Sequence, residues 1–174
     1  LGLGASPGIT NLLGKIAIDQ LDKAHTIYTG WNLAEARPEE VSSQKKTNAA
    51  MIHGIEQITG KVKIYENDNF KMIKPLKKLK LTYPNLGTYS SYIFGHPEAI
   101  TFPYHNKNIS NSVNLAHGNK FTIFILRIIR QLINLKLITK NKAAKFLDWL
   151  ERQGSSKKHS QEDSLPEIYA LAIG

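Results

Sequence analysis

Two side chains that can carry a proton stand two positions apart in the segment Gly95-His96-Pro97-Glu98. Proline fixes its own φ at about −65°, so the imidazole of His96 and the carboxylate of Glu98 have a restricted mutual geometry. Such a pair can act on a substrate hydroxyl or hold a substrate ammonium, which makes both residues candidates for catalysis. The same spacing also occurs in solvated turns without a chemical role, and spacing alone favours that simpler interpretation.

Glycines recur at the start of the chain in the pattern Gly2-x-Gly4-x-x-x-Gly8, which precedes the apolar periodicity of a helix. Glycines at a helix N-terminus allow backbone N–H groups to approach a dinucleotide pyrophosphate. However, such a loop follows a complete strand, and only Leu1 precedes it here; the expected acidic residue is also missing after Tyr28-Thr29-Gly30-Trp31. The sequence therefore does not predict a primary dinucleotide fingerprint. It predicts a polar helix cap at Ser6 and Gly8 that faces a cofactor.

No metal site or thiol chemistry is expected. The chain has no cysteine, and no H-E-x-x-H arrangement occurs. The histidines other than His96 and His105 do not have the spacing of metal ligands. They are His25, His53, His117 and His159.

The chain is basic, with a formal charge of +9 over 174 residues. Residues 61–80 hold seven lysines against Glu66 and Asp68, a pattern that can attract nucleic acid. Yet the basic residues are 19 lysines and 4 arginines, without arginine-aromatic interleaving for reading bases. We therefore do not expect a nucleic-acid partner, and keep a basic nucleic-acid-binding module as the alternative.

A membrane location is not expected either. The longest apolar stretch, residues 121–126, is far shorter than the roughly 20 residues that span a bilayer. No signal peptide is visible, so we expect a cytoplasmic protein.

The apolar periodicity predicts four helices and six strands. A helix begins at Ser6-Pro7, and its apolar stripe is Ile9, Leu12, Leu13, Ile16 and Ala17. We expect helices over residues 6–22, 48–59, 121–137 and 141–153, and strands over residues 25–31, 61–65, 70–74, 88–94, 111–116 and 168–174. The expected inward-facing residues of the last two helices are Ile125, Ile128, Ile129, Leu132 and Ile133, then Ala144, Leu147 and Leu150.

These elements predict one α+β domain over residues 1–174, with a mixed, mostly antiparallel sheet and helices on one face. The Ser-, Lys- and His-rich segment 154–164 is expected to be a mobile loop. The chain begins in the apolar run Leu1-Gly2-Leu3-Gly4 and ends in an apolar run that predicts a buried strand. We therefore expect a fragment of a longer protein.

Three segments resemble the saccharopine dehydrogenase family in the same order along the chain. Residues 4–13, Gly-Ala-Ser-Pro-Gly-Ile-Thr-Asn-Leu-Leu, are similar to the Gly-x-x-Pro-Gly-x-x-[Asn/His] run that follows the family's nucleotide-binding domain. Residues 95–103 resemble its His-Pro-Glu segment, and residues 165–174 resemble the strand from which the chain returns to the cofactor.

The resemblance implies a second domain, similar to the C-terminal domains of glyceraldehyde-3-phosphate and homoserine dehydrogenases. The parent would be an NAD- or NADP-dependent oxidoreductase acting on the C–N bond of an amino-acid-derived amine or imine. This fragment would be its substrate-binding and dimerisation domain, inactive alone and without bound cofactor. Its partners would be an N-terminal Rossmann domain in cis, a second copy in a homodimer and an amino-acid-like small molecule. A purely structural dimerisation domain is the remaining alternative.

The resemblance also implies roles for individual residues. Ser6, Pro7, Gly8 and Asn11 would lie near the nicotinamide end of the cleft, within a junction formed by residues 1–13. His96 and Glu98 would belong to the substrate wall. No arginine clamp for a substrate carboxylate can be named, because three of the four arginines lie on expected helices.

Overall fold

The computed structural model of the chain describes residues 4–33, 49–154 and 165–174. In chain order, the elements within these ranges are α1 (Ile9–Asp19), β1 (Thr26–Asn32), α2 (Ala49–Glu56), β2 (Val62–Glu66), β3 (Asn69–Ile73), β4 (Lys78–Tyr83), β5 (Gly87–Ile93), α3 (Glu98–His105), β6 (Asn111–His117), α4 (Lys120–Asn134), α5 (Lys140–Gly154) and β7 (Ile168–Ile173). The predicted loop at 154–164 lies outside the described residues, apart from Gly154 at the end of α5.

All seven described strands belong to one sheet, which is built around β6. β1 runs parallel to β6, with Thr26 opposite Asn111, and antiparallel β7 pairs with the other edge of β1. The second edge of β6 is divided between two partners: β2 pairs at Ser112, and β5 pairs at Leu115 to His117. β1–β6 is the parallel pair of this otherwise antiparallel sheet, so the predicted α+β class is confirmed.

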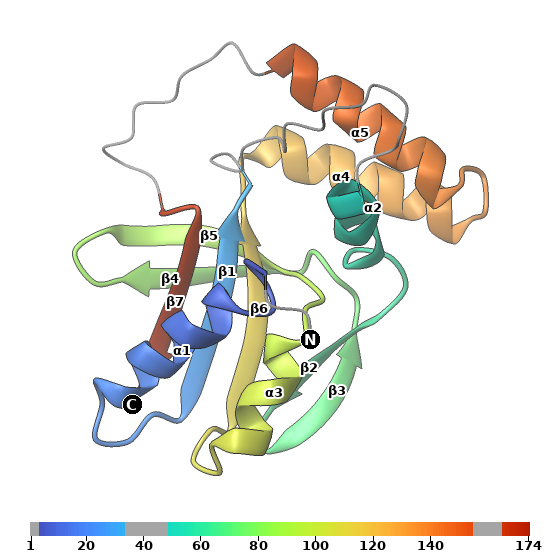
Figure 1. Ribbon diagram of the computed structural model, residues 1–174. Helices are drawn as coiled ribbons and strands as arrows, with labels where there is room; N and C mark the ends of the chain where they lie inside the picture. Colours follow the sequence, from blue (N-terminus) through green and yellow to red (C-terminus); the bar gives the residue numbers. More distant parts are fainter. Residues whose placement is uncertain (1–3, 34–48, 155–164) are drawn as a thin grey trace.

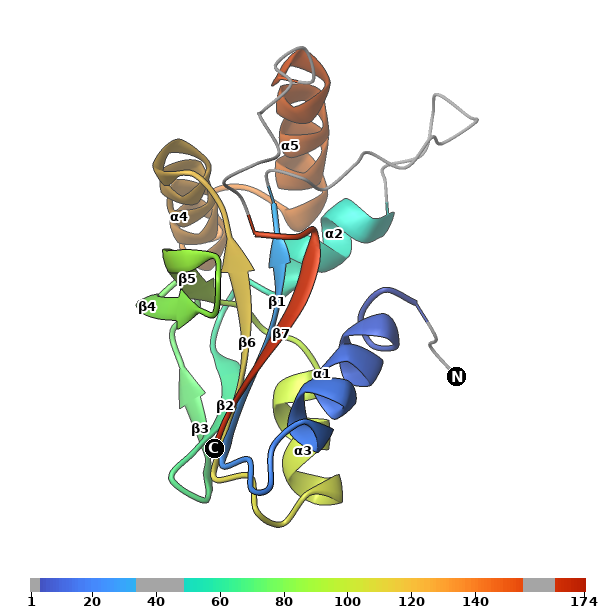
Figure 2. The ribbon, with the colours of Figure 1, turned by 90° about the vertical axis from the view of Figure 1, so that its left-hand side faces the viewer.

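The helices divide into two groups around the sheet (Figures 1 and 2). α1 and α3 lie side by side on one face, whereas α2, α4 and α5 gather beyond one end of β1 and β6. The β4–β5 hairpin crosses the long axis of the central strands. A core between this hairpin and the opposite face of the sheet contains Leu115 and Ile93, joined by the partly buried Leu79 and Leu81.

The β2–β3 hairpin forms as predicted. Asn67 and Asp68 connect the two strands with φ of 52° and 60°, the left-handed conformation that two-residue hairpin turns require. The sequence analysis missed β4, whose lysines alternate with half-buried residues, and α3, which contains Pro103. Proline within a short apolar segment weakens any helix prediction.

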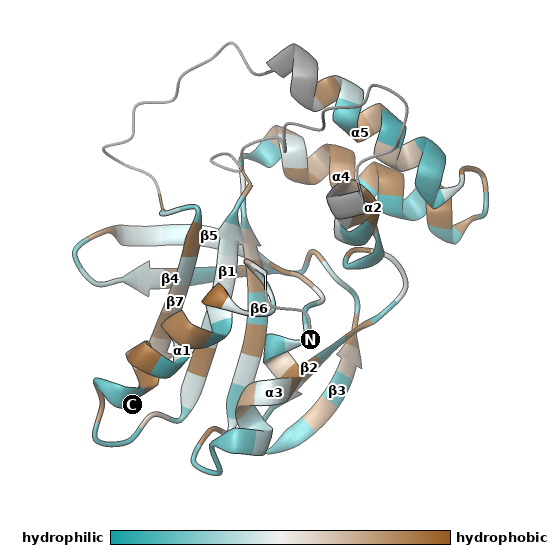
Figure 3. Cartoon of the chain, viewed as in Figure 1, coloured by the Kyte–Doolittle hydropathy of each residue, from teal (hydrophilic) through white to brown (hydrophobic). Residues whose placement is uncertain are grey.

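The apolar stripe predicted for α1 forms on the helix but mostly faces outward. Leu12 is 66% exposed, and Ile9 and Ile16 are also exposed, whereas Thr10 and Gly14 are buried. Gly14 faces α3 closely: a Cβ at this position would lie 2.3 Å from the ring of Phe102. α1 therefore packs through its small and polar side and presents its apolar side outward, as the brown face of α1 in Figure 3 shows.

The predicted inward face of α4 is partly wrong. Ile123, Leu126 and Ile129 are buried, whereas Ile128 is 44% exposed. Apolar residues occupy two adjacent stripes of this helix, so periodicity alone does not select the buried one. The C-terminal strand β7 forms as predicted, but it is an edge strand and is only half-buried, whereas a buried strand was predicted.

Candidate functional site

Three predicted site residues from segments far apart in the sequence meet under α1 and α3. Ser6 lies in the loop before α1, His96 follows β5, and Glu98 is the first residue of α3. Ser6 Oγ lies 2.8 Å from His96 Nδ1 and also donates a hydrogen bond to Glu98 Oε1. The structure therefore brings the two segments into one polar cluster, which we call the Ser6–His96–Glu98 cluster.

Glu98 is the most buried member of this cluster, with 0% of its surface exposed. Its Oε1 accepts hydrogen bonds from the hydroxyls of Ser6 and Thr10. Its Oε2 has no hydrogen-bond partner among the described residues and lies 3.8 Å from His96 Nδ1. A buried carboxylate oxygen without a donor is costly, so Oε2 is a position at which a donor or a cation would bind favourably.

Counting donors assigns the protons of the cluster. Ser6 has one hydroxyl proton, and it is donated to Glu98. The oxygen of Ser6 must then accept the 2.8 Å hydrogen bond from the protonated Nδ1 of His96. In the neutral ring this leaves Nε2 of His96 with a free lone pair, which can accept a proton from a ligand.

Aromatic rings surround His96 and keep water away from it. The ring stacks against Trp31 at a centroid distance of 5.6 Å and against Phe94 at 6.1 Å, and it meets the ring of His53 edge-to-face at a centroid distance of 5.4 Å. Burial lowers the pKa of His96 below its ordinary value, and His53 lowers it further; attraction to Glu98 acts in the opposite direction. The lowered pKa favours the neutral ring, which is the form able to act as a base.

A second polar layer lies on the strands under α1 and α3. Asn114 donates to Thr29 Oγ1 at 2.7 Å, and Ser112 donates to the backbone oxygen of Glu98 at 3.3 Å. Asn114 Oδ1 and the indole N–H of Trp31 are buried without a hydrogen-bond partner among the described residues. Together with Glu98 Oε2, this side of the sheet therefore holds two buried acceptors and one buried donor without a hydrogen-bond partner in the described part of the chain.

The predicted site residues Gly8 and Asn11 make hydrogen bonds within the loop before α1 and the first turn of this helix. Gly8, not Ser6, is the N-cap of α1, and its N–H is accepted by Asn11 Oδ1 at 3.1 Å. The N–H groups of Ile9 and Thr10 bond to the carbonyls of Gly4 and Ala5. Ser6 does not cap the helix because Glu98 and His96 engage its hydroxyl.

These bonds bear on how an NAD(P) cofactor would fit. Phosphate binding at a helix start needs free N–H groups, and the first N–H groups of α1 are already paired within the loop. A Cβ at Gly8 would lie 2.1 Å from the oxygen of Gly4, so the loop is closed on itself. The residues at the start of α1 therefore do not fit the phosphates of a dinucleotide.

Sequence reasoning missed three residues of the site: Thr10, Trp31 and Asn114. Thr10 belongs to the first resembling segment, and its place between Gly8 and Asn11 in that segment was the available signal. Trp31 and Asn114 lie on the adjacent parallel strands β1 and β6, and only the pairing of these strands brings them near the cluster.

The basic segment 61–80 is spread over β2, β3 and β4. Lys71 pairs with Glu66 at 2.7 Å, and Lys63 lies 5.6 Å from the centre of the Phe70 ring. Among the described residues, no group of three or more histidine, aspartate or glutamate side chains is arranged to hold a metal ion. None of the described helices has the length and apolar character needed to cross a membrane.

No protein-family model and no curated protein matches this sequence. The resemblance to saccharopine dehydrogenases therefore rests on the three segments, two of which contribute to the Ser6–His96–Glu98 cluster.

Proposed function

We propose that the chain is the substrate-binding domain of an NAD(P)-dependent oxidoreductase of the saccharopine dehydrogenase-like class. The substrate is an amino-acid-derived amine or imine. The observation that carries the proposal is the fully buried Glu98, whose Oε1 is occupied by two hydroxyls while Oε2 has no donor in the described part of the chain. A substrate ammonium supplies both the charge and the hydrogen bond that Oε2 lacks.

His96 acts next to this position. Its Nδ1 is held by Ser6, and its Nε2 accepts a proton from the substrate nitrogen. Ser6 and Thr10 orient Glu98 from the opposite oxygen. In this proposal the chain's own residues bind the amine, fix its orientation and accept one proton.

The cofactor belongs to another domain of the parent protein in this proposal. The N–H groups of Gly8, Ile9 and Thr10 at the start of α1 are already paired, in agreement with a cofactor site elsewhere. The outward apolar stripe of α1, formed by Ile9, Leu12 and Ile16, is suited to packing against a neighbouring domain. Hydride transfer would be supplied by the cofactor bound there.

The test is calorimetry of the 174-residue chain with amino-acid-derived secondary amines, and separately with NADPH. We expect an amine to bind wild-type protein and Glu98→Gln to weaken that binding by at least about tenfold, because the carboxylate charge is lost. The matched control is Glu56→Gln, which removes an exposed carboxylate paired with Lys140. Tight stoichiometric binding of NADPH, or amine binding that Glu98→Gln leaves unchanged, would overturn the proposal.

A further inference from the structure

The helical hairpin of α4 and α5 exposes large apolar side chains away from the Ser6–His96–Glu98 cluster. Those on the two helices and their connection are Phe121, Phe124, Ile128, Leu135, Leu137, Phe146 and Trp149, all exposed. Phe146 and Trp149 stack on each other at a centroid distance of 6.1 Å. Apolar groups gathered in this way on a water-exposed surface mark an interaction site.

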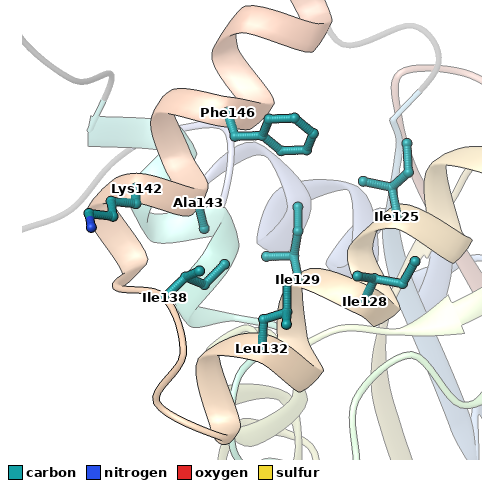
Figure 4. Close-up of a pocket in the computed structure, with 8 residues that line it drawn as sticks. All are labelled: Ile125, Ile128, Ile129, Leu132, Ile138, Lys142, Ala143 and Phe146. Atoms are coloured by element: carbon teal, nitrogen blue, oxygen red, sulfur yellow. The ribbon is translucent and has the colours of Figure 1, made fainter.

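Two of these side chains, Ile128 and Phe146, line a groove between the two helices (Figure 4), which we call the α4–α5 groove. Its volume is about 390 Å³, and it is lined by Ile125, Ile128, Ile129, Leu132, Ile138, Lys142, Ala143 and Phe146. α2 packs against α4 and α5 through Ile55, which contacts the buried Ile129 and Ala144. The groove is thus a concave apolar channel on an ordered three-helix layer, a shape that accepts one further helix.

The residues that line the groove include one charged side chain, Lys142, and no acidic one; Asp148 and Glu151 follow later on α5. Residues 120–147 contain five lysines and two arginines, and no acidic residue occurs between Glu98 and Asp148. Arg127 and Arg130 donate to backbone oxygens of Leu76 and Pro75. Lys140 pairs with Glu56. The four remaining cations have no ion pair in the described part of the chain: Lys120, Lys136, Lys142 and Lys145.

This charge selects among possible occupants. A symmetric second copy would bring the same basic surface against itself, which is repulsive. An acidic partner gains instead from each lysine at the rim. A helix with an apolar stripe at i, i+3, i+4 and i+7 fits the concave channel, whereas a flat surface does not fill it.

We infer that the α4–α5 groove binds an acidic amphipathic helix of a partner protein. The apolar stripe of that helix contacts Ile125, Ile128 and Phe146, and acidic residues on its flanks meet Lys142 and Lys145. This surface lies on helices other than those that carry the amine site, so the two proposals stand independently.

The test is fluorescence anisotropy of a labelled designed peptide with the 174-residue chain. The peptide has about 15 residues, with leucine at the stripe positions and glutamate at the others. A scrambled peptide of the same composition retains the charge and loses the stripe. We expect the patterned peptide to bind at least about tenfold more tightly than the scrambled one, a difference of about 1.4 kcal/mol.

Matched variants locate the binding surface. Ile128→Glu and Phe146→Glu change exposed residues, so both should fold, and each should weaken binding by at least about tenfold. Met72→Glu adds the same negative charge at an exposed position on β3, outside the groove. It should weaken peptide binding only through the general repulsion of one added charge. Lys142→Glu combined with Lys145→Glu should weaken binding and reduce its salt dependence.

Three results would overturn the inference. The first is equal affinity for the patterned and scrambled peptides. The second is preferential binding to vesicles containing anionic phosphatidylglycerol, lost in Phe146→Glu, which would identify a lipid surface instead. The third is self-association in analytical ultracentrifugation that Ile128→Glu abolishes, which would identify a second copy as the occupant.

Discussion

Replacing Glu98 tests the construction of the buried cluster, because alanine and glutamine remove different parts of its role. Alanine removes the acceptor of the Ser6 and Thr10 hydroxyls and leaves a space in a fully buried position. Glutamine keeps an acceptor oxygen of nearly the same shape and removes the charge. Comparing the two variants separates hydrogen bonding from charge.

The expected magnitudes follow from the available substitutes. An unsatisfied buried donor costs about 1–3 kcal/mol. In Glu98→Ala, Thr10 still reaches the oxygen of Ala5 at 3.2 Å. The Ser6 hydroxyl can donate to His96 Nδ1, 2.8 Å away, once the imidazole proton moves from Nδ1 to Nε2. Each loss therefore falls at the low end, and with the cavity we expect about 2–4 kcal/mol less stability. For Glu98→Gln we expect a change within about 1 kcal/mol.

The assay is urea unfolding followed by far-UV circular dichroism, since two-state analysis suits a domain of this size. A stability of Glu98→Ala within about 0.5 kcal/mol of wild type would show that the hydroxyls do not depend on Glu98. Equal destabilisation by both substitutions would show that the charge, and not the acceptor oxygen, maintains the cluster.

Further predictions concern His96, Gly14 and the hairpin turn. The unfolded chain takes up a proton near the ordinary histidine pKa of 6.5, and folded His96 only at lower pH, so the stability in urea should fall as the pH drops below 6.5. His96→Gln should flatten this dependence, and an unchanged slope would contradict the burial argument. Gly14→Ala should lower stability by about 1–3 kcal/mol in calorimetric melts, because its Cβ would meet the ring of Phe102 at 2.3 Å; an unchanged melting temperature would refute this close packing. Asp68→Gly should raise stability by about 0.5–1 kcal/mol, because Asp68 has a φ of 60°, and a lower melting temperature would contradict the turn assignment.

Local patterns were sufficient to predict most elements. The two residues Asn67 and Asp68 determine the β2–β3 hairpin, and the β-branched and aromatic run of β1 predicts its strand. The α+β class follows from these elements, and the structure confirms it. The direction in which α1 faces could not be predicted, because a close contact between Gly14 and Phe102 overrides its apolar stripe.

The candidate site was predicted only in part, because contacts between distant segments determine which residues join it. Spacing identified His96 and Glu98, but their partner Ser6 lies 90 residues from His96 in the sequence. The contribution of Thr10 depends on α1 facing the sheet with its polar side and not with its apolar stripe. Long-range packing, rather than local pattern, therefore determines which hydroxyls reach the carboxylate.

The central claim of the proposal, that Glu98 binds a substrate amine next to a neutral His96, is tested most directly by turnover of the oxidoreductase to which the proposal assigns this chain. The measurement is NAD(P)H-linked conversion of amino-acid-derived imines and amines, compared among wild type, Glu98→Gln and the exposed control Glu56→Gln. We predict that Glu98→Gln lowers kcat/KM by about 100-fold or more while its fold is retained, and that Glu56→Gln has no effect. Turnover of Glu98→Gln within about threefold of wild type, a change below 1 kcal/mol, would contradict the account.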